Sequence, residues 1–196
     1  MAIVDIYNTD RKYKIIYADP PWSYRVWAKE TGGRTARSHY QVMSVEEICK
    51  LPVNNIADND SVLFLWATYP NLPEAFKVIN AWGFEYKTVA FTWVKVYKNG
   101  TPFVGLGHWT RANAEICLLA TKGSIKRANK NVSQIIISVP EEHSKKPDEA
   151  RDRIVMLMGD LSRIELFARQ QPDGWDVWGD EVSRLNFNIL KRRNEQ

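Results

Sequence analysis

Residues 61–67 (SVLFLWA) form a run that is apolar almost throughout. A strand with one face in water alternates apolar and polar residues, so an unbroken run indicates a strand covered on both faces. Residues 14–18 (KIIYA) form a second short run of this kind, which stops before two consecutive prolines. Strands covered on both faces need helices on each side, and this predicts an α/β fold with a mostly parallel sheet flanked by helices.

The rest of the chain alternates between strand-like and helical patterns. Helices are predicted over residues 72–82 and after Pro147, and a glycine follows each of them. Further strands are predicted at residues 88–97, 115–121, 163–168 and 175–178. Ligands of such sheets bind beyond the carboxyl ends of the strands. We therefore expect Asp19 to Trp22 and the residues after Phe167 to lie on one common edge.

Composition narrows the class of protein only modestly. With 196 residues the chain is long enough for one sizeable core, and we expect residues 1–196 to form a single domain. A formal net charge of +4 permits a nucleic-acid partner without requiring one. Two cysteines are too few for a disulfide framework, and three scattered histidines predict no metal site. Without a signal-peptide pattern or an apolar run of about 20 residues, we expect a cytoplasmic protein away from the membrane.

Two stretches, residues 25–43 and 98–111, lack a clear pattern and combine basic with aromatic residues. Loops of this length inside a compact domain are usually lids, binding loops or disordered segments. We expect both to be mobile loops that contact substrate or cofactor. Plain solvated loops are the alternative.

The tetrapeptide Asp19-Pro20-Pro21-Trp22 follows the first apolar run directly. A carboxylate followed by proline can hold both protons of an adenine amino group, one on Asp19 and one on the Pro20 carbonyl. The nitrogen lone pair is then free to turn toward a methyl donor. Trp22 would stack on the base. The alternative is a turn that ends the strand and carries a packed tryptophan.

This tetrapeptide resembles the catalytic signature of the MT-A70 family of adenine methyltransferases. Further segments resemble the same family in the same order: FLW at 64–66, WVK at 93–95, GHW at 107–109, SKKPDE at 144–149, IELFAR at 164–169 and GWDVWG at 174–179. The resemblance implies a Rossmann-like methyltransferase fold in permuted order, with the catalytic motif N-terminal and the cofactor motif C-terminal. It also implies S-adenosylmethionine as the cofactor and methylation of the 6-amino group of adenine in nucleic acid.

The same resemblance assigns roles to single residues. The tetrapeptide Asp19 to Trp22 would be catalytic, Lys146 would hold the cofactor's carboxylate, and Arg169 would contact its ribose. Further cofactor contacts are implied for Ala18, Asp19, Pro147, Glu165, Phe167, Asp180 and Glu181. Contacts near the target base are implied for Tyr40, Lys95, His108, Trp109 and Glu115.

The residues themselves leave alternatives to several of these roles. By its neighbours alone, Glu165 is either a charge at a strand edge or a buried acceptor, and Lys146 is an exposed lysine by default. Trp175 and Trp178 are more typical of core than of cofactor contacts. Asp180 and Glu181 depart from the amide pair of the family's mRNA enzyme.

The sequence leaves the polymer open. An adenine amino group lies inside a duplex, so the enzyme must flip its base or use single strands. The chain carries no recognisable RNA-binding module and resembles compact bacterial and phage members that act on DNA, so we prefer DNA over RNA. An RNA methyltransferase, an inactive scaffold subunit and transfer to another amino group such as that of cytosine are the alternatives. A homodimer or a related partner subunit is also open.

Overall fold

The computed structural model describes residues 1–23, 42–105, 107, 109–141 and 145–182. Within them a seven-stranded sheet has the order β5-β3-β4-β2-β1-β6-β7. The strands are β1 (Tyr13–Ala18), β2 (Ala57–Ala67), β3 (Glu85–Lys95), β4 (Ala114–Lys122), β5 (Ile135–Ser138), β6 (Arg163–Leu166) and β7 (Asp176–Trp178). The helices are α1 (Val45–Cys49), α2 (Val53–Ile56), α3 (Leu72–Ala81) and α4 (Glu149–Met158), with a short 3-10 turn η2 (Tyr69–Asn71) before α3.

The sheet is mostly parallel, as the apolar runs predict. β1 runs parallel to β2 and to β6, β6 runs parallel to β7, and β3 runs parallel to β5. Only β4 is reversed, and it pairs antiparallel with β2 on one side and with β3 on the other. The start of β4 therefore lies at the same edge of the sheet as the carboxyl ends of its neighbours.

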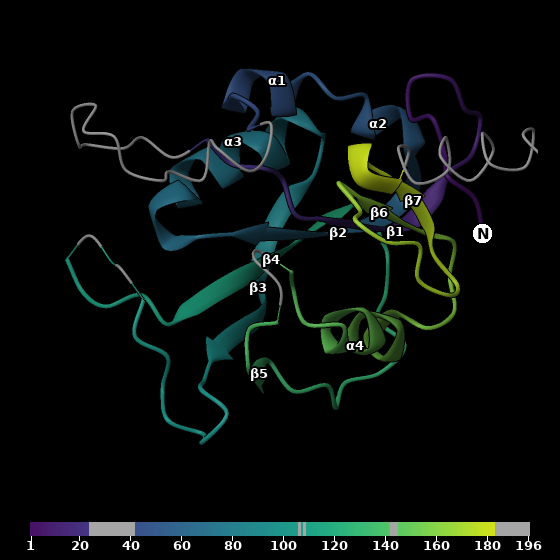
Figure 1. Ribbon diagram of the computed structural model, residues 1–196. Helices are drawn as coiled ribbons and strands as arrows, with labels where there is room; N and C mark the ends of the chain where they lie inside the picture. The colour runs from purple at the N-terminus through teal and green to yellow at the C-terminus, as the bar shows by residue number, and fades with distance from the viewer. Residues whose placement is uncertain (24–41, 106, 108, 142–144, 183–196) are drawn as a thin grey trace, which may run out of the picture.

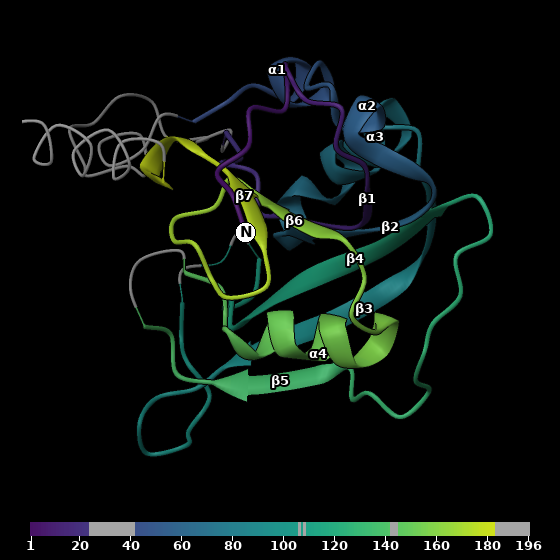
Figure 2. The ribbon, with the colours of Figure 1, turned by 90° about the vertical axis from the view of Figure 1, so that its right-hand side faces the viewer.

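Helices cover both faces of the sheet, which explains why β1 and β2 are apolar without alternation. In Figures 1 and 2, α1, α2 and α3 lie above the sheet and α4 lies below it. Ile16, Leu63 and Leu65 pack into the core under α1 to α3, whereas Tyr17 and Phe64 pack into the core over α4. The expected α/β architecture is confirmed.

The expected common edge is also observed. In the parallel pairing of β1 with β6, Ala18 lies opposite Leu166, so both strands end at the same level. The chain leaves β6 through Phe167, whose φ of 61° is the only positive φ of a non-glycine residue among those described. This left-handed residue ends the strand two residues earlier than the sequence predicts.

Three short elements escaped the sequence analysis: α1, α2 and β5. Of these, α1 could have been predicted from its first residues. Ser44 and Glu47 form a capping box, in which each side chain accepts from the backbone N–H of the other. β5 is a four-residue edge strand, and Arg153 of α4 donates to the outward carbonyls of Ser133 and Ile135. An edge capped in this way is less open to pairing with another chain.

The described part of residues 98–111 forms a narrow antiparallel arm beyond β3. Val96 bridges to Pro102, and Gly105 bridges to Ala112. Trp109 lies on this arm with 93% of its surface exposed. The expected loop over residues 25–43 lies almost wholly outside the described residues.

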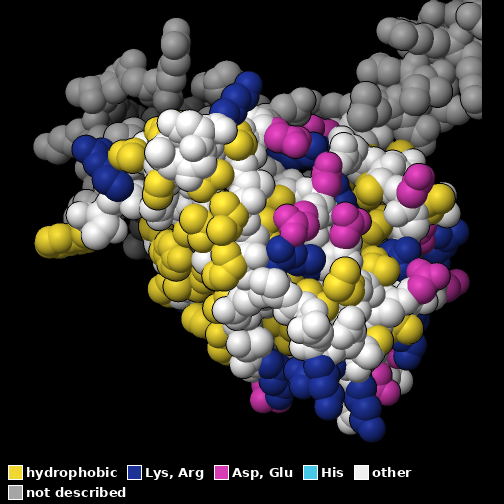
Figure 3. All heavy atoms as spheres, turned by 90° about the horizontal axis from the view of Figure 1, so that it is seen from below, with side chains coloured by type: hydrophobic (Ala, Val, Ile, Leu, Met, Phe, Trp, Pro, Cys, Tyr) yellow, Lys and Arg dark blue, Asp and Glu magenta, His cyan; other side chains and the backbone are white. Residues whose placement is uncertain are grey.

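The surface seen from below, over β5 and α4, carries a broad group of hydrophobic side chains beside mixed acidic and basic ones (Figure 3). Ile137 of β5 is among the exposed apolar residues. Among the described helices, none has both the length and the apolar character needed to cross a membrane.

Asp176, the first residue of β7, ties the N-terminal segment to the sheet. Its carboxylate accepts from the backbone N–H of Ala2 at 2.6 Å, from Arg11 at 2.7 Å and from the Tyr13 hydroxyl at 2.8 Å. Although burial alone would raise the pKa of Asp176, these three hydrogen bonds hold that pKa below its ordinary value. The carboxylate is therefore stabilised in its charged form by folding.

We predict that Asp176→Asn lowers the free energy of unfolding by about 1–3 kcal/mol at pH 7, because partly buried donors lose a charged acceptor. Because the pKa of Asp176 is lower in the folded than in the unfolded protein, its charge stabilises the fold at pH values above the unfolded pKa. The stability lost in the variant should therefore persist from about pH 5 upward and shrink below about pH 4. Urea titrations at several pH values measure both. Asp10→Asn, at an exposed aspartate, is the control, and an equal effect of the two variants would contradict the account.

Candidate active site

The tetrapeptide forms a tight turn directly after β1. The backbone N–H of Trp22 donates to the Pro20 carbonyl at 2.8 Å, and the N–H of Met43 donates to the Pro21 carbonyl at 3.0 Å. The first bond spans two residues and fixes the direction of the Pro20 carbonyl, which keeps a second lone pair. Two prolines suit this turn because neither has an N–H to leave unpaired.

Asp19, at the head of this turn, belongs to a cluster of four charged side chains. The Lys146 ammonium lies 2.7 Å from Asp19 Oδ2 and 3.2 Å from Glu115 Oε2. Lys95 pairs with the other oxygen of Glu115. The cluster joins the end of β1, the starts of β4 and α4, and the end of β3, and its two positive charges balance its two negative ones.

Burial and pairing together set the protonation of this cluster. Burial raises the pKa of Asp19, and Lys146 offsets part of that effect. For Lys146, burial works against the charge, but Asp19 and Glu115 outweigh it and raise the pKa of the ammonium. Burial also opposes ionisation of Glu115, yet Lys146 and Lys95 lower its pKa. Lys146 is therefore charged at neutral pH, and it binds the Oδ2 oxygen of Asp19.

Aromatic rings form the floor of the cluster. The Lys146 ammonium lies 5.6 Å from the ring centre of Trp66, and the Lys95 ammonium lies 4.6 Å from that of Trp93. The second contact shows that Trp93 and Lys95 lie on the same side of β3. Trp66 in turn donates from its indole nitrogen to the Tyr17 hydroxyl at 2.7 Å. A floor of this kind keeps water away from the ion pairs above it and so strengthens them.

The position of Trp22 corrects the expectation that its ring stacks on a base. Only 6% of Trp22 is exposed, and its ring packs in the core under α1 to α3. Its indole nitrogen donates to the Trp66 carbonyl at 3.0 Å, which ties the turn to the end of β2. The alternative of a packed tryptophan in a strand-ending turn describes this residue better, because the ring is almost wholly buried and its indole N–H is already bonded.

The expected cofactor residues gather where β6 and β7 end. Ala18 lies beside Leu166, Phe167 follows it with its ring 5.3 Å from that of Trp178, and Arg169 reaches to 3.7 Å from Glu181. Gly179 lies so close to the backbone of Ala168 that a Cβ there would collide with it. Backbone strain such as the left-handed Phe167 is characteristic of ligand-binding segments.

Glu165 is a buried acceptor, not a strand-edge charge. Both of its oxygens contact Arg151 of α4, at 3.3 and 3.1 Å. The role of Arg151 was not predicted from the sequence. An arginine at an apolar position of a helix nevertheless indicates that it has a buried partner. Trp175 is in the core with 2% exposed, as expected from its surroundings.

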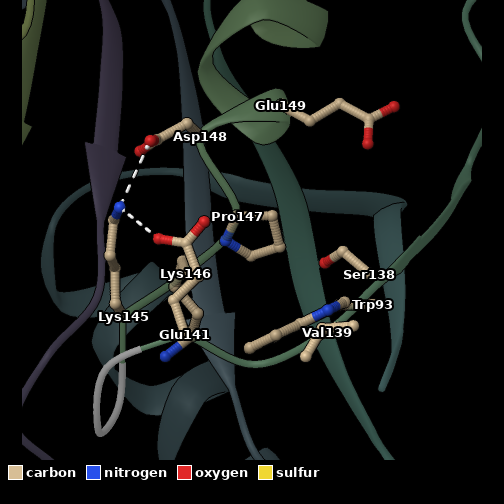
Figure 4. A pocket seen from close by; sticks show the side chains of 9 residues that line it. All are labelled: Trp93, Ser138, Val139, Glu141, Lys145, Lys146, Pro147, Asp148 and Glu149. Atoms are coloured by element: carbon tan, nitrogen blue, oxygen red, sulfur yellow. Dashed lines mark hydrogen bonds and ion pairs between the residues drawn. The ribbon is translucent and has the colours of Figure 1, made fainter. Parts of the chain in front are cut away.

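A pocket of about 200 Å³ opens beside the cluster at the start of α4 (Figure 4). It is lined by Trp93, Ser138, Val139, Glu141, Lys145, Lys146, Pro147, Asp148 and Glu149. Lys145 pairs there with Glu141 and Asp148. Of the residues expected near the target base, Lys95 and Glu115 join the cluster and Trp109 lies on the arm. Tyr40 and His108 lie outside the described residues.

The charges at this edge fit S-adenosylmethionine, which carries a carboxylate, an ammonium and a sulfonium. Lys146 and Arg169 are cations suited to the carboxylate and the ribose oxygens, and Asp19, Glu165 and Glu181 are acceptors suited to the cationic and hydroxyl groups. A parallel sheet with these groups beyond its carboxyl ends is compatible with a Rossmann-like methyltransferase fold.

Comparison with known proteins agrees with this class. The model of the MT-A70 family matches residues 13–181, so the chain belongs to the MT-A70 family, whose adenine-N6 methyltransferases use S-adenosylmethionine. It is 35% identical to the type II methyltransferase M.MunI of Mycoplasma sp., over 91% of this chain and 82% of that protein.

More distant relatives are longer. The chain is 27% identical to the N6-methyladenosine RNA methyltransferase MTA1 of Pyricularia oryzae, but spans 47% of that protein. It is 26% identical to the human N(6)-adenine-specific methyltransferase METTL4 and spans 39% of it. The chain therefore corresponds to less than half of each of these two proteins.

We predict that Trp22→Phe lowers the free energy of unfolding by about 1–2 kcal/mol, because the buried Trp66 carbonyl loses its donor. Chemical denaturation followed by circular dichroism measures the loss. Trp109→Phe, at an exposed tryptophan, should leave stability within about 0.5 kcal/mol. A Trp22 variant as stable as the wild type would restore the stacking hypothesis.

Proposed function

We propose that this chain transfers the methyl group of S-adenosylmethionine to the 6-amino group of adenine in DNA. The observation that carries the proposal is the geometry of Asp19. Its Oδ2 is held by Lys146, while no hydrogen bond to Oδ1 is found among the described residues. The carboxylate thus offers one free acceptor beside the Pro20 carbonyl, and two acceptors are what an amino group with two protons needs.

The chemistry of the amino group explains why both acceptors matter. Its lone pair is delocalised into the adenine ring, so the nitrogen must rehybridise before it can react. Asp19 Oδ1 and the Pro20 carbonyl would each accept one amino proton, which directs the lone pair out of the ring plane. The nitrogen sheds a proton once it is alkylated, and a carboxylate whose pKa is raised by burial is suited to receive it.

Bound S-adenosylmethionine supplies an electrophilic methyl group on a sulfonium. We assign its carboxylate to Lys146 and its ribose to the end of β6, where Glu165 accepts from the hydroxyls and Arg169 donates to them. Lys146 would then have two functions, since the same ammonium orients Asp19. The charge balance of the cluster keeps both functions compatible with burial.

The choice of DNA rests on the similarity to M.MunI. The relative that this chain nearly spans is named a type II methyltransferase, a class that acts on DNA. The fungal relative named as an RNA methyltransferase is about twice as long as the part that this chain matches. The higher identity to M.MunI, 35% against 27%, supports DNA as the substrate.

We predict that tritiated S-adenosylmethionine labels adenine-containing DNA, and that nucleoside analysis recovers N6-methyldeoxyadenosine. Duplex DNA, single-stranded DNA and RNA of matched sequence are assayed in parallel. Label in RNA alone would overturn the choice of DNA, and label in cytosine would overturn the choice of base. The absence of label on every polymer, with intact cofactor binding, would favour a scaffold subunit.

Asp19→Ala in the same assay should lower turnover by about a hundredfold or more, because an acceptor that acts on the reacting atom is lost. Its dissociation constant for the cofactor should change only severalfold, as calorimetry would show. Asp58→Ala, at a residue remote from the edge, is the matched control. Near-normal turnover of Asp19→Ala would disprove the proposed mechanism.

A further inference from the structure

Arg151 of α4 is buried to an unusual degree for an arginine. Only 8% of the residue is exposed, and its side chain points at the sheet instead of at solvent. Nη1 contacts both carboxylate oxygens of Glu165, at 3.3 and 3.1 Å, and Nη2 pairs with Asp148 just before the helix. One guanidinium therefore connects the start of α4 to the strand that leads into the expected cofactor segment.

Glu165 occupies a position from which it could reach a ligand. It is the third residue of β6 and lies two residues before the left-handed Phe167. Its cross-strand neighbours are Tyr17 on β1 and Val177 on β7. Its side chain keeps 13% of its surface exposed after Arg151 has bound the carboxylate, so the residue is not closed off from a ligand.

We propose that Arg151 is a positioning residue for the cofactor site: its guanidinium fixes the Glu165 carboxylate as a charged acceptor for the ribose hydroxyls of S-adenosylmethionine. This inference rests on the assignment of Glu165 to the ribose made under the proposed function. It adds a residue of α4 that acts on the cofactor only through the Glu165 carboxylate.

The surroundings of Glu165 explain why a cation is needed. Burial raises its pKa to about 7, even though Arg151 lowers it, and the nearby carboxylates of Asp19 and Asp148 raise it further. Tyr17 also faces it, and the pKa of Tyr17 is itself raised well above its ordinary value by burial. A protonated carboxyl loses acceptor capacity. Without Arg151 the side chain would be neutral at physiological pH.

Cofactor affinity should therefore depend on the protonation of Glu165. A carboxylate that titrates near pH 7 is charged above that pH, so cofactor affinity should rise between about pH 6 and pH 8 in the wild type. In Arg151→Met the pKa of Glu165 moves up, and the midpoint of the affinity profile moves up with it. At pH 7 the dissociation constant should rise about fivefold when the midpoint moves up by one unit, and about tenfold for each further unit.

The experiment is a calorimetric titration of the purified chain with S-adenosylmethionine from pH 5.5 to 9, for the wild type and three variants. Arg151→Met should shift the midpoint upward, and Arg151→Lys, which keeps the charge, should restore most of the affinity. Glu165→Gln should flatten the profile. Arg153→Met is the matched control, because Arg153 lies on the same helix but pairs with Glu149 and caps β5, and its midpoint should equal that of the wild type.

A second readout does not depend on cofactor. Carbon-13 NMR of the glutamate carboxyl groups, assigned through Glu165→Gln, gives the Glu165 pKa in the free protein. A value near 7 in the wild type, higher in Arg151→Met, supports the proposal. If Arg151→Met does not fold, Arg151→Gln takes its place, and a Glu165 pKa that is the same in the wild type and in the uncharged variant overturns the proposal. If Arg151→Met binds the cofactor with the same affinity midpoint as the wild type, the proposal is also overturned. If the wild type binds the cofactor with the expected pH profile but does not methylate DNA, only the proposed function is refuted.

Discussion

The ammonium of Lys146 holds the site together. It lies between the carboxylates of Asp19 and Glu115, which come from widely separated parts of the chain. A buried carboxylate without such a partner would be costly, and so would a buried lysine. Each buried charge in the cluster is therefore stabilised only by the opposite charges beside it. The fold must bring β1, β4 and the segment before α4 together to form these ion pairs.

This requirement explains the reversed strand. Among the described strands, β4 alone runs against its neighbours, and its direction places Glu115 at the edge where β1 ends. A parallel β4 would carry Glu115 to the opposite edge and leave Lys146 with one carboxylate. The aromatic floor of Trp66 and Trp93 is placed by the same sheet, since both residues lie near strand ends at that edge.

Much of this arrangement follows from sequence. Unbroken apolar runs predict a sheet covered on both faces, and the end of each run predicts that Asp19 and Phe167 share an edge. The partner of Lys146 could not be predicted from the residues alone, because 127 positions separate it from Asp19 and only the strand order decides which residues meet. The family resemblance supplies the role of Lys146 toward the cofactor but not its contact with Asp19.

Two further features depend on side-chain packing, which a linear pattern does not encode. The exposed or buried state of Trp22 depends on whether the turn folds back onto β2, and the bond to the Trp66 carbonyl shows that it does. Arg151 is one of two arginines of α4, and only the position of β6 selects it over Arg153 as the partner of Glu165.

A double-mutant cycle on the free energy of unfolding tests the central ion pair most directly. Asp19→Asn, Lys146→Met and the double variant are compared with the wild type by urea denaturation at pH 8. Because the two side chains are in direct contact in a mostly buried site, the account predicts a coupling energy of about 1–3 kcal/mol. Effects that add to within about 0.5 kcal/mol would contradict it.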